Sequence, residues 1–201
     1  MSKRWSQNPA ELSTPSKRYE RCIPVSVCVT PRISFDRITD RGEGDVVSQR
    51  YTCRPGPAGL TEAAILLIDF NREYDYPVPE SDWLAAHLDT LVKSGDTSVL
   101  TFGTPAIGVA ILRFRAGTLS ADIEAYLAEF YVRPGLRGKG YGTTFLDDVI
   151  EHARGRGATY MDLNTSEDDE AARHVYEKRG FDCHEGRGEG PKALYYELEL
   201  N

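Results

Sequence analysis

Apolar residues along this 201-residue chain recur with two different periods, and the changes of period outline a series of strands and helices. Alternating or continuous apolar runs predict strands over 46–54, 97–102, 106–114, 123–132, 159–163, 181–183 and 193–200. Helical spacing predicts helices that begin near Gly59 or Thr61 and near 141, and two further helices that are capped by Ser81 and Ser166. The resulting order, β-α-α-β-β-β-α-β-α-β-β, indicates a mixed α/β (α+β) domain.

The first 45 residues lack this periodicity. They are polar and hold four scattered prolines, so we expect residues 1–45 to be a flexible or loosely docked extension. The short apolar run 23–29 is a candidate edge strand within it. Residues 46–201 are predicted to form one domain, which is long enough to bury a full core.

Composition narrows the class of protein. The hydrophobic content of 40% and charged content of 27% are those of a globular protein. A net charge of -7 argues against a nucleic-acid binder, and no apolar run is long enough for a membrane helix. No secretory signal is evident, so we expect a cytoplasmic protein with reduced thiols, although a Cys22–Cys28 disulfide stays open. Scattered cysteines and histidines predict no metal site.

A basic, glycine-rich turn joins the strand 123–132 to the helix that follows it. Within six positions it holds two cations and three glycines: Arg137, Gly138, Lys139, Gly140 and Gly142. Glycines let the backbone approach a ligand and direct successive N–H groups at it. The helix N-terminus adds partial positive charge. The turn therefore suits a diphosphate.

The spacing within this turn distinguishes three kinds of anion-binding loop. A nucleoside-triphosphate loop requires glycine where Arg133 stands, and Ser or Thr where Gly140 follows Lys139. A dinucleotide loop requires a wider spacing before its last glycine. The remaining pattern, Arg/Gln-x-x-Gly-x-Gly/Ala, is satisfied by Arg137, Gly140 and Gly142.

A second motif lies about 30 residues downstream. The segment 169–181 resembles Asn-x-x-Ala-x-x-x-Tyr-x-x-x-Gly-Phe, with Asp169 in place of the Asn. Together the two motifs resemble the GNAT family of N-acetyltransferases over roughly residues 50–200. The resemblance implies a mixed, mostly antiparallel seven-stranded sheet flanked by about four helices. It also implies that the fourth and fifth strands splay apart around the pantetheine arm of acetyl-CoA, the co-substrate.

The resemblance assigns cofactor contacts to three parts of the chain. Pantetheine is expected at the backbone of Phe130, Tyr131 and Val132. The diphosphate is expected at Arg137, Gly138, Lys139, Gly140, Tyr141, Gly142 and Thr143. An ionised Asp169 cannot donate a hydrogen bond as the family's Asn does, so a capping role competes for it and Asn164 is an alternative donor.

Acetyl transfer to an amine needs a group that takes a proton and a group that protonates the departing thiolate. The segment 124–132 resembles that of aminoglycoside 3-N-acetyltransferases, which implies Glu129 as the base, with Glu124 second. These two residues are five positions apart, so alternation places them on opposite faces unless a bulge intervenes. Either carboxylate can instead pair with a neighbouring strand. Tyr176 matches the family's acid, and packing on the sheet is its alternative role.

The segment between the first two helices covers the acceptor site in this family. Here it contains acids and aromatics, which suit a small polycationic amine such as an aminoglycoside or a polyamine: Glu73, Tyr74, Asp75 and Tyr76. An ordinary solvated loop is the alternative. The expected activity is acetyl-CoA-dependent N-acetylation of a small-molecule amine. A protein or peptide acceptor and a non-catalytic acetyl-CoA-binding module stay open, as does the oligomeric state, with a homodimer as one candidate.

Overall fold

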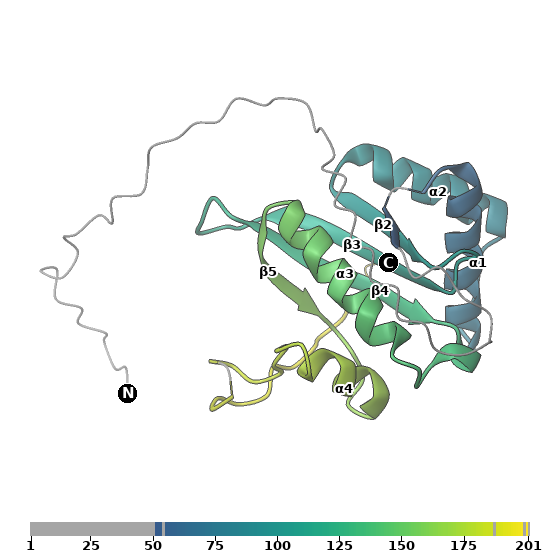
Figure 1. Ribbon diagram of the computed structural model, residues 1–201. Coiled ribbons are helices and arrows are strands. Elements are labelled where there is room, and N and C mark those ends of the chain that lie inside the picture. Colours follow the sequence, from purple (N-terminus) through teal and green to yellow (C-terminus); the bar gives the residue numbers. More distant parts are fainter. Residues whose placement is uncertain (1–50, 54, 187, 199, 201) are drawn as a thin grey trace, which may run out of the picture. The chain divides into compact units, whose positions relative to one another are not determined.

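The computed structural model describes residues 51–53, 55–186, 188–198 and 200 (Figure 1). All of them belong to the unit Gly44–Asn201. The predictions made for residues 1–45, and for the strand over 46–50, lie outside the described residues.

The described residues form one mixed sheet with the strand order β1-β2-β3-β4-β5. Its strands are β1 (Tyr51–Cys53), β2 (Thr97–Phe102), β3 (Gly108–Ala116), β4 (Ile123–Val132) and β5 (Ala158–Leu163). The first four strands are antiparallel to their neighbours, whereas β4 and β5 are parallel. The expected hairpin between β2 and β3 and the mixed, mostly antiparallel sheet are confirmed.

Four helices cover the two faces of the sheet, as Figure 1 shows. They are α1 (Pro57–Arg72), α2 (Ser81–Ser94), α3 (Tyr141–Gly155) and α4 (Glu170–Glu177). The buried residues of α1 and α2 form a core with Val99, Val109 and Ile111 on one face. Alternate residues such as Leu100 and Leu112 point to the other face and pack with α3 and α4. None of these helices, within the described part of the chain, is long and apolar enough to cross a bilayer.

The two predicted helix caps are wrong: Ser81 is already the first residue of α2, and Ser166 does not cap α4. The helix begins at Glu170, and Asp169 is its N-cap. The Asp169 carboxylate accepts a hydrogen bond of 3.0 Å from the backbone N–H of Ala172. A carboxylate satisfies an otherwise unpaired N–H group and complements the helix dipole, which explains why the helix starts there.

Strand β4 is irregular on both of its edges. Its register with β3 shifts between Ile111, which pairs with Glu129, and Leu112, which pairs with Leu127. Ala128 is thus the extra residue of a β-bulge. On the other edge the pairing with β5 ends at Leu127. Residues 128–132 consequently have no partner from β5, and the expected splay of the fourth and fifth strands is confirmed.

The chain after α4 does not form the two strands predicted over 181–183 and 193–200. The described residues there contain only an isolated bridge between His184 and Lys192. Their apolar side chains stay in solvent, with exposed fractions of 72% for Leu194 and 82% for Tyr196. Alternation predicts a strand only where a neighbouring strand and a buried face receive it, and this segment contacts neither along its length.

Candidate functional site

The glycine-rich turn leaves open space at the N-terminus of α3. Gly138 and Gly140 have φ values of 75° and 85°, in the region that favours glycine. A Cβ atom added at Gly138, Gly140 or Gly142 would meet nothing within 4 Å. The first turn of α3 has neither a side-chain cap nor an acidic residue. Its N–H groups are therefore available to an anion, and the turn fits a diphosphate.

The side chain of Arg137 points from this turn back toward the end of β4. Its Nε donates to the carbonyl oxygen of Val132 over 2.8 Å, and its Nη2 lies 2.9 Å from a carboxylate oxygen of Glu73. Its guanidinium also stands 5.3 Å from the centre of the Tyr131 ring. Lys139 is exposed and has no ion pair within the described residues.

The end of β4 joins the two cores. Phe130 packs on Phe145, with ring centres 5.3 Å apart, in the core of the α3 and α4 face. Tyr131 is buried in the core of the α1 and α2 face. The backbone of Phe130, Tyr131 and Val132, predicted to meet pantetheine, lies on the edge that β5 leaves free.

The bulge sets the direction of the Glu129 side chain. Leu127 and Phe130 pack in the core of the α3 and α4 face, whereas Ala128 and Tyr131 pack in that of α1 and α2. Alternation from Phe130 directs Glu129 toward the α1 and α2 face, the same face as Ala128. The extra residue thus reverses the parity that strict alternation gives along this strand.

Glu124 lies on this face as well, but away from Glu129. It alternates with Ala125, which is buried in the core of the opposite face. Its carboxylate accepts a hydrogen bond of 2.9 Å from Arg115, which also binds Asp162 over 3.0 Å. Five residues of strand separate the two glutamates by about 16 Å. Glu129 therefore lies beside the splay, and Glu124 lies where β4 and β5 still pair.

Burial raises the pKa of the Glu129 carboxyl, and the positive charge of Arg113 opposes this effect. No hydrogen bond to the Glu129 carboxylate occurs within the described residues. Arg113 faces the same side of the sheet, because it alternates with the buried Leu112. Arg113 is not among the predicted site residues, although this alternation could have placed it on the face of Glu129. A partly desolvated carboxylate without a partner is a stronger base than a solvated one.

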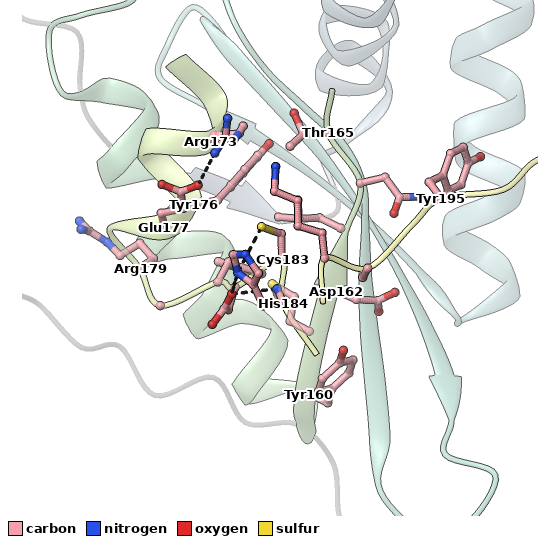
Figure 2. A pocket seen from close by; sticks show the side chains of 18 of the residues that line it. Tyr160, Asp162, Thr165, Arg173, Tyr176, Glu177, Arg179, Cys183, His184 and Tyr195 are labelled. Carbon is pink, nitrogen blue, oxygen red and sulfur yellow. Dashed lines mark hydrogen bonds and ion pairs between the residues drawn. The ribbon is translucent and has the colours of Figure 1, made fainter. Parts of the chain in front are cut away.

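Tyr176 approaches the splay from the opposite face. It is 8% exposed, and its ring centre lies 6.2 Å from that of Phe130 and 5.9 Å from that of Phe181. Burial and the negative charge of Asp169 raise the pKa of the phenol. In Figure 2 its side chain extends from α4 into a pocket, toward Thr165. Glu129 and Tyr176 thus flank the end of β4 from its two sides.

The pocket in Figure 2 has a volume of about 1330 Å³ and lies between β5, α4 and the chain after α4. Asn164 contributes to its lining and donates to the Tyr126 hydroxyl over 3.3 Å. The glycine-rich turn does not line the pocket. This hollow arises where the C-terminal segment leaves β5 uncovered. We therefore place the candidate site at the splay and the turn.

The four predicted acceptor-side residues after α1 differ in their contacts and exposure. Glu73 contacts Arg137 and Tyr131. Tyr74 and Tyr76 stack with ring centres 6.4 Å apart and stay exposed, and Asp75 is also exposed. Partial burial and the negative charge of Asp169 raise the pKa of Tyr74.

Three consecutive residues bring metal-ligand atoms together, within 4.8 Å of one another: Asp182, Cys183 and His184. The imidazole Nδ1 is 2.9 Å from Asp182 and 3.7 Å from the Cys183 sulfur. Neighbouring positions in one exposed turn account for this proximity without an ion. The absence of a metal site stays a prediction.

Comparisons with known proteins place this arrangement in a family. The chain matches the model of the acetyltransferase (GNAT) family over residues 65–181. A crystal structure of a protein from Arthrobacter sp. FB24, described as an acetyltransferase, is 36% identical. It covers 81% of this chain and 100% of that chain, with a TM-score of 0.66.

Two more distant structures share the fold. An aminoglycoside acetyltransferase from an uncultured soil metagenomic sample, bound to sisomicin, is 14% identical over 75% of this chain and 97% of that chain, with a TM-score of 0.59. Ribosomal-protein-alanine N-acetyltransferase from Brucella melitensis biovar Abortus 2308 is 18% identical over 77% of this chain and 99% of that chain, with a TM-score of 0.57. No curated protein matches the chain. Because the family model covers more than half of the sequence, this protein belongs to the GNAT family of acetyltransferases.

Proposed function

We propose that this protein is an acetyl-CoA-dependent N-acetyltransferase that acts on a primary amine of a small molecule. The observation that carries the proposal is the position of Glu129. Its partly buried carboxyl, with a raised pKa, stands on the strand whose free edge leads directly into the uncapped turn. Donor and acceptor sites can thus meet at one point of the sheet.

The proposed reaction is direct attack of the amine on the thioester. The ammonium form first loses a proton to the Glu129 carboxylate, directly or through water. The amine nitrogen then forms a bond to the carbonyl carbon, and the carbon–sulfur bond breaks. The departing sulfur takes the Tyr176 proton, and the nitrogen of the new amide gives up its second proton to solvent. Exchange with solvent then returns a proton to the Tyr176 phenolate and removes the one held by Glu129. Backbone N–H groups on the free edge of β4 are positioned to stabilise the oxyanion.

The open part of the acceptor-side segment supports a small cationic acceptor. Asp75 would attract an ammonium group, and the exposed rings of Tyr74 and Tyr76 offer faces on which a cation or a sugar can stack. This is the basis for proposing an aminoglycoside or a polyamine. The aminoglycoside enzyme found above shares only the fold, so its substrate does not by itself decide the acceptor.

Thiol release from acetyl-CoA, measured against a panel of polyamines, aminoglycosides, amino acids and short peptides, tests the proposal. We expect Glu129→Gln to lower kcat by about 10²- to 10⁴-fold, the usual contribution of a general base. Tyr176→Phe should also lower kcat. Glu124→Gln is the matched control, and it should leave kcat within about twofold because Glu124 lies far along the strand.

Each alternative predicts its own result. Turnover with peptides alone would replace the small-molecule acceptor by a peptide. Binding of acetyl-CoA without turnover of any amine would favour a non-catalytic binding module. Unchanged rates in both Glu129→Gln and Tyr176→Phe would refute the assigned roles.

A further inference from the structure

Three side chains from distant parts of the sequence contact one another beside the glycine-rich turn. We call this contact the clasp; it consists of Glu73, Tyr131 and Arg137. Glu73 follows the last residue of α1, and Arg137 lies 64 positions later in the turn. The Nη2 of Arg137 lies 2.9 Å and 3.2 Å from the two carboxylate oxygens of Glu73.

Tyr131 holds the clasp against the core. Its hydroxyl donates to a Glu73 oxygen over 2.9 Å. Tyr131 is 3% exposed, and the centre of its ring lies 5.3 Å from that of Phe70 and 5.3 Å from Cζ of Arg137. The clasp is therefore anchored in the packing between α1 and β4 and is more than a pair of solvated charges.

The clasp engages two of the three guanidinium nitrogens of Arg137. Its Nε donates a hydrogen bond to the last carbonyl of β4, that of Val132, and its Nη2 donates to the Glu73 carboxylate. Turning the guanidinium toward a diphosphate would leave that carbonyl and the Glu73 carboxylate without these partners, at a cost typical of unpaired polar groups. The N–H groups of the turn and the exposed Lys139 require no such rearrangement.

We propose that the Arg137 side chain is a positioning residue and not a diphosphate ligand. Through Glu73 it fastens the cofactor turn to the end of α1, from which the acceptor-side residues Tyr74, Asp75 and Tyr76 continue. The clasp thereby couples the binding of coenzyme A to the conformation of the acceptor side. The identity of the ligand rests on the proposed function, whereas the clasp itself does not.

The effect of Glu73→Gln on coenzyme A binding has opposite signs under the two interpretations. If Arg137 bound the diphosphate, removing the competing Glu73 charge would free the guanidinium and tighten binding. If the clasp positions the turn, the same substitution loosens the turn and weakens binding. Residues that act through one contact also give non-additive effects in a double-mutant cycle.

Calorimetric titration with coenzyme A tests this in wild type, Glu73→Gln, Arg137→Gln and the double variant. We expect each single variant to weaken binding by about 3- to 30-fold, and the double variant to match the weaker single variant within about twofold. Lys139→Gln is the control for a charge that contacts phosphate, and its effect should add fully to that of Glu73→Gln. Tighter binding in Glu73→Gln, or additive losses in the double variant, would overturn the proposal.

Hydrogen exchange of the ligand-free protein tests the clasp independently of the proposed function. We expect the hydrogen-bonded amides of Leu136, Arg137 and Thr144, which flank the turn, to exchange several-fold faster in Glu73→Gln than in wild type, because the turn loses its anchor. This result is independent of any ligand. Failure of the wild type to bind coenzyme A would refute the proposed function alone, while unchanged exchange in Glu73→Gln would refute the clasp.

Discussion

At the scale of single residues, the most informative feature is a carboxyl group that opposes folding when ionised. Burial raises the pKa of Glu129 above its usual value of 4.5. The folded protein therefore binds this proton more tightly than the unfolded chain. The stability associated with the protonated form is fully present below pH 4.5 and is lost as the pH rises through the folded-state pKa. A catalytic base would account for retaining such a group.

We predict that Glu129→Gln increases the free energy of unfolding at pH 8 although it lowers kcat. An uncharged amide avoids the cost of desolvating a carboxylate. The gain should shrink as the pH falls toward 4, where the glutamate of the wild type is protonated. Urea unfolding of both proteins at several pH values measures the difference.

Glu124→Gln provides the comparison on the same strand. Glu124 is paired with Arg115, so its replacement should lower the free energy of unfolding by about 0–1 kcal/mol at neutral pH. A stability of Glu129→Gln below that of wild type at pH 8 would contradict the assignment of Glu129 as a desolvated base.

At the scale of elements, the local sequence pattern predicts some strands and helices correctly and misses features that depend on tertiary contacts. Apolar periodicity and glycine positions predicted the strand 123–132 and the helix near 141–155, because burial of one face and the turn chemistry are encoded nearby. Alternation leaves open whether a bulge lies between Glu124 and Glu129, and its position at Ala128 depends on the pairing with β3. The clasp escaped prediction because Glu73 and Arg137 meet only in the fold.

At the N-terminus of α4, Asp169 stands where the family motif has Asn, and substitution can test the effect of this difference. Asp169 caps the helix, and burial together with the negative charge of Asp169 raises the pKa of Tyr176 and of Tyr74. We predict that Asp169→Asn preserves stability, because Asn and Asp are nearly equivalent caps, and tightens coenzyme A binding, because an amide can donate. Asp169→Ala, the control, should cost about 1 kcal/mol of stability. Thermal unfolding and calorimetric titration measure the two effects, and weaker binding by Asp169→Asn would argue against a cofactor contact there.

At the scale of the whole molecule, the candidate site is assembled from elements that are distant in the sequence. Tyr131 at the end of β4 contacts Glu73 after α1 and Arg137 in the turn before α3. Its neighbour Phe130 contacts Tyr176 of α4. The family motifs located two of these parts. The C-terminal alternation predicted strands that are not formed, because a local pattern does not reveal whether a neighbouring edge will accept it.

Binding of coenzyme A should raise the global stability of the protein. A ligand that binds only the folded state stabilises it by about 2.7 kcal/mol at 100 times Kd, which for a domain of this size raises Tm by roughly 5–10 °C. Gly142→Val is the matched variant: Gly142 lies in the first turn of α3, its added side chain meets no atom within 4 Å, and its φ is not positive. We expect the ligand-free Tm of Gly142→Val to stay near that of wild type while the shift caused by coenzyme A disappears, because the new side chain fills the space above the turn. Differential scanning calorimetry with and without coenzyme A measures both values, and a shift preserved in Gly142→Val would place the diphosphate elsewhere.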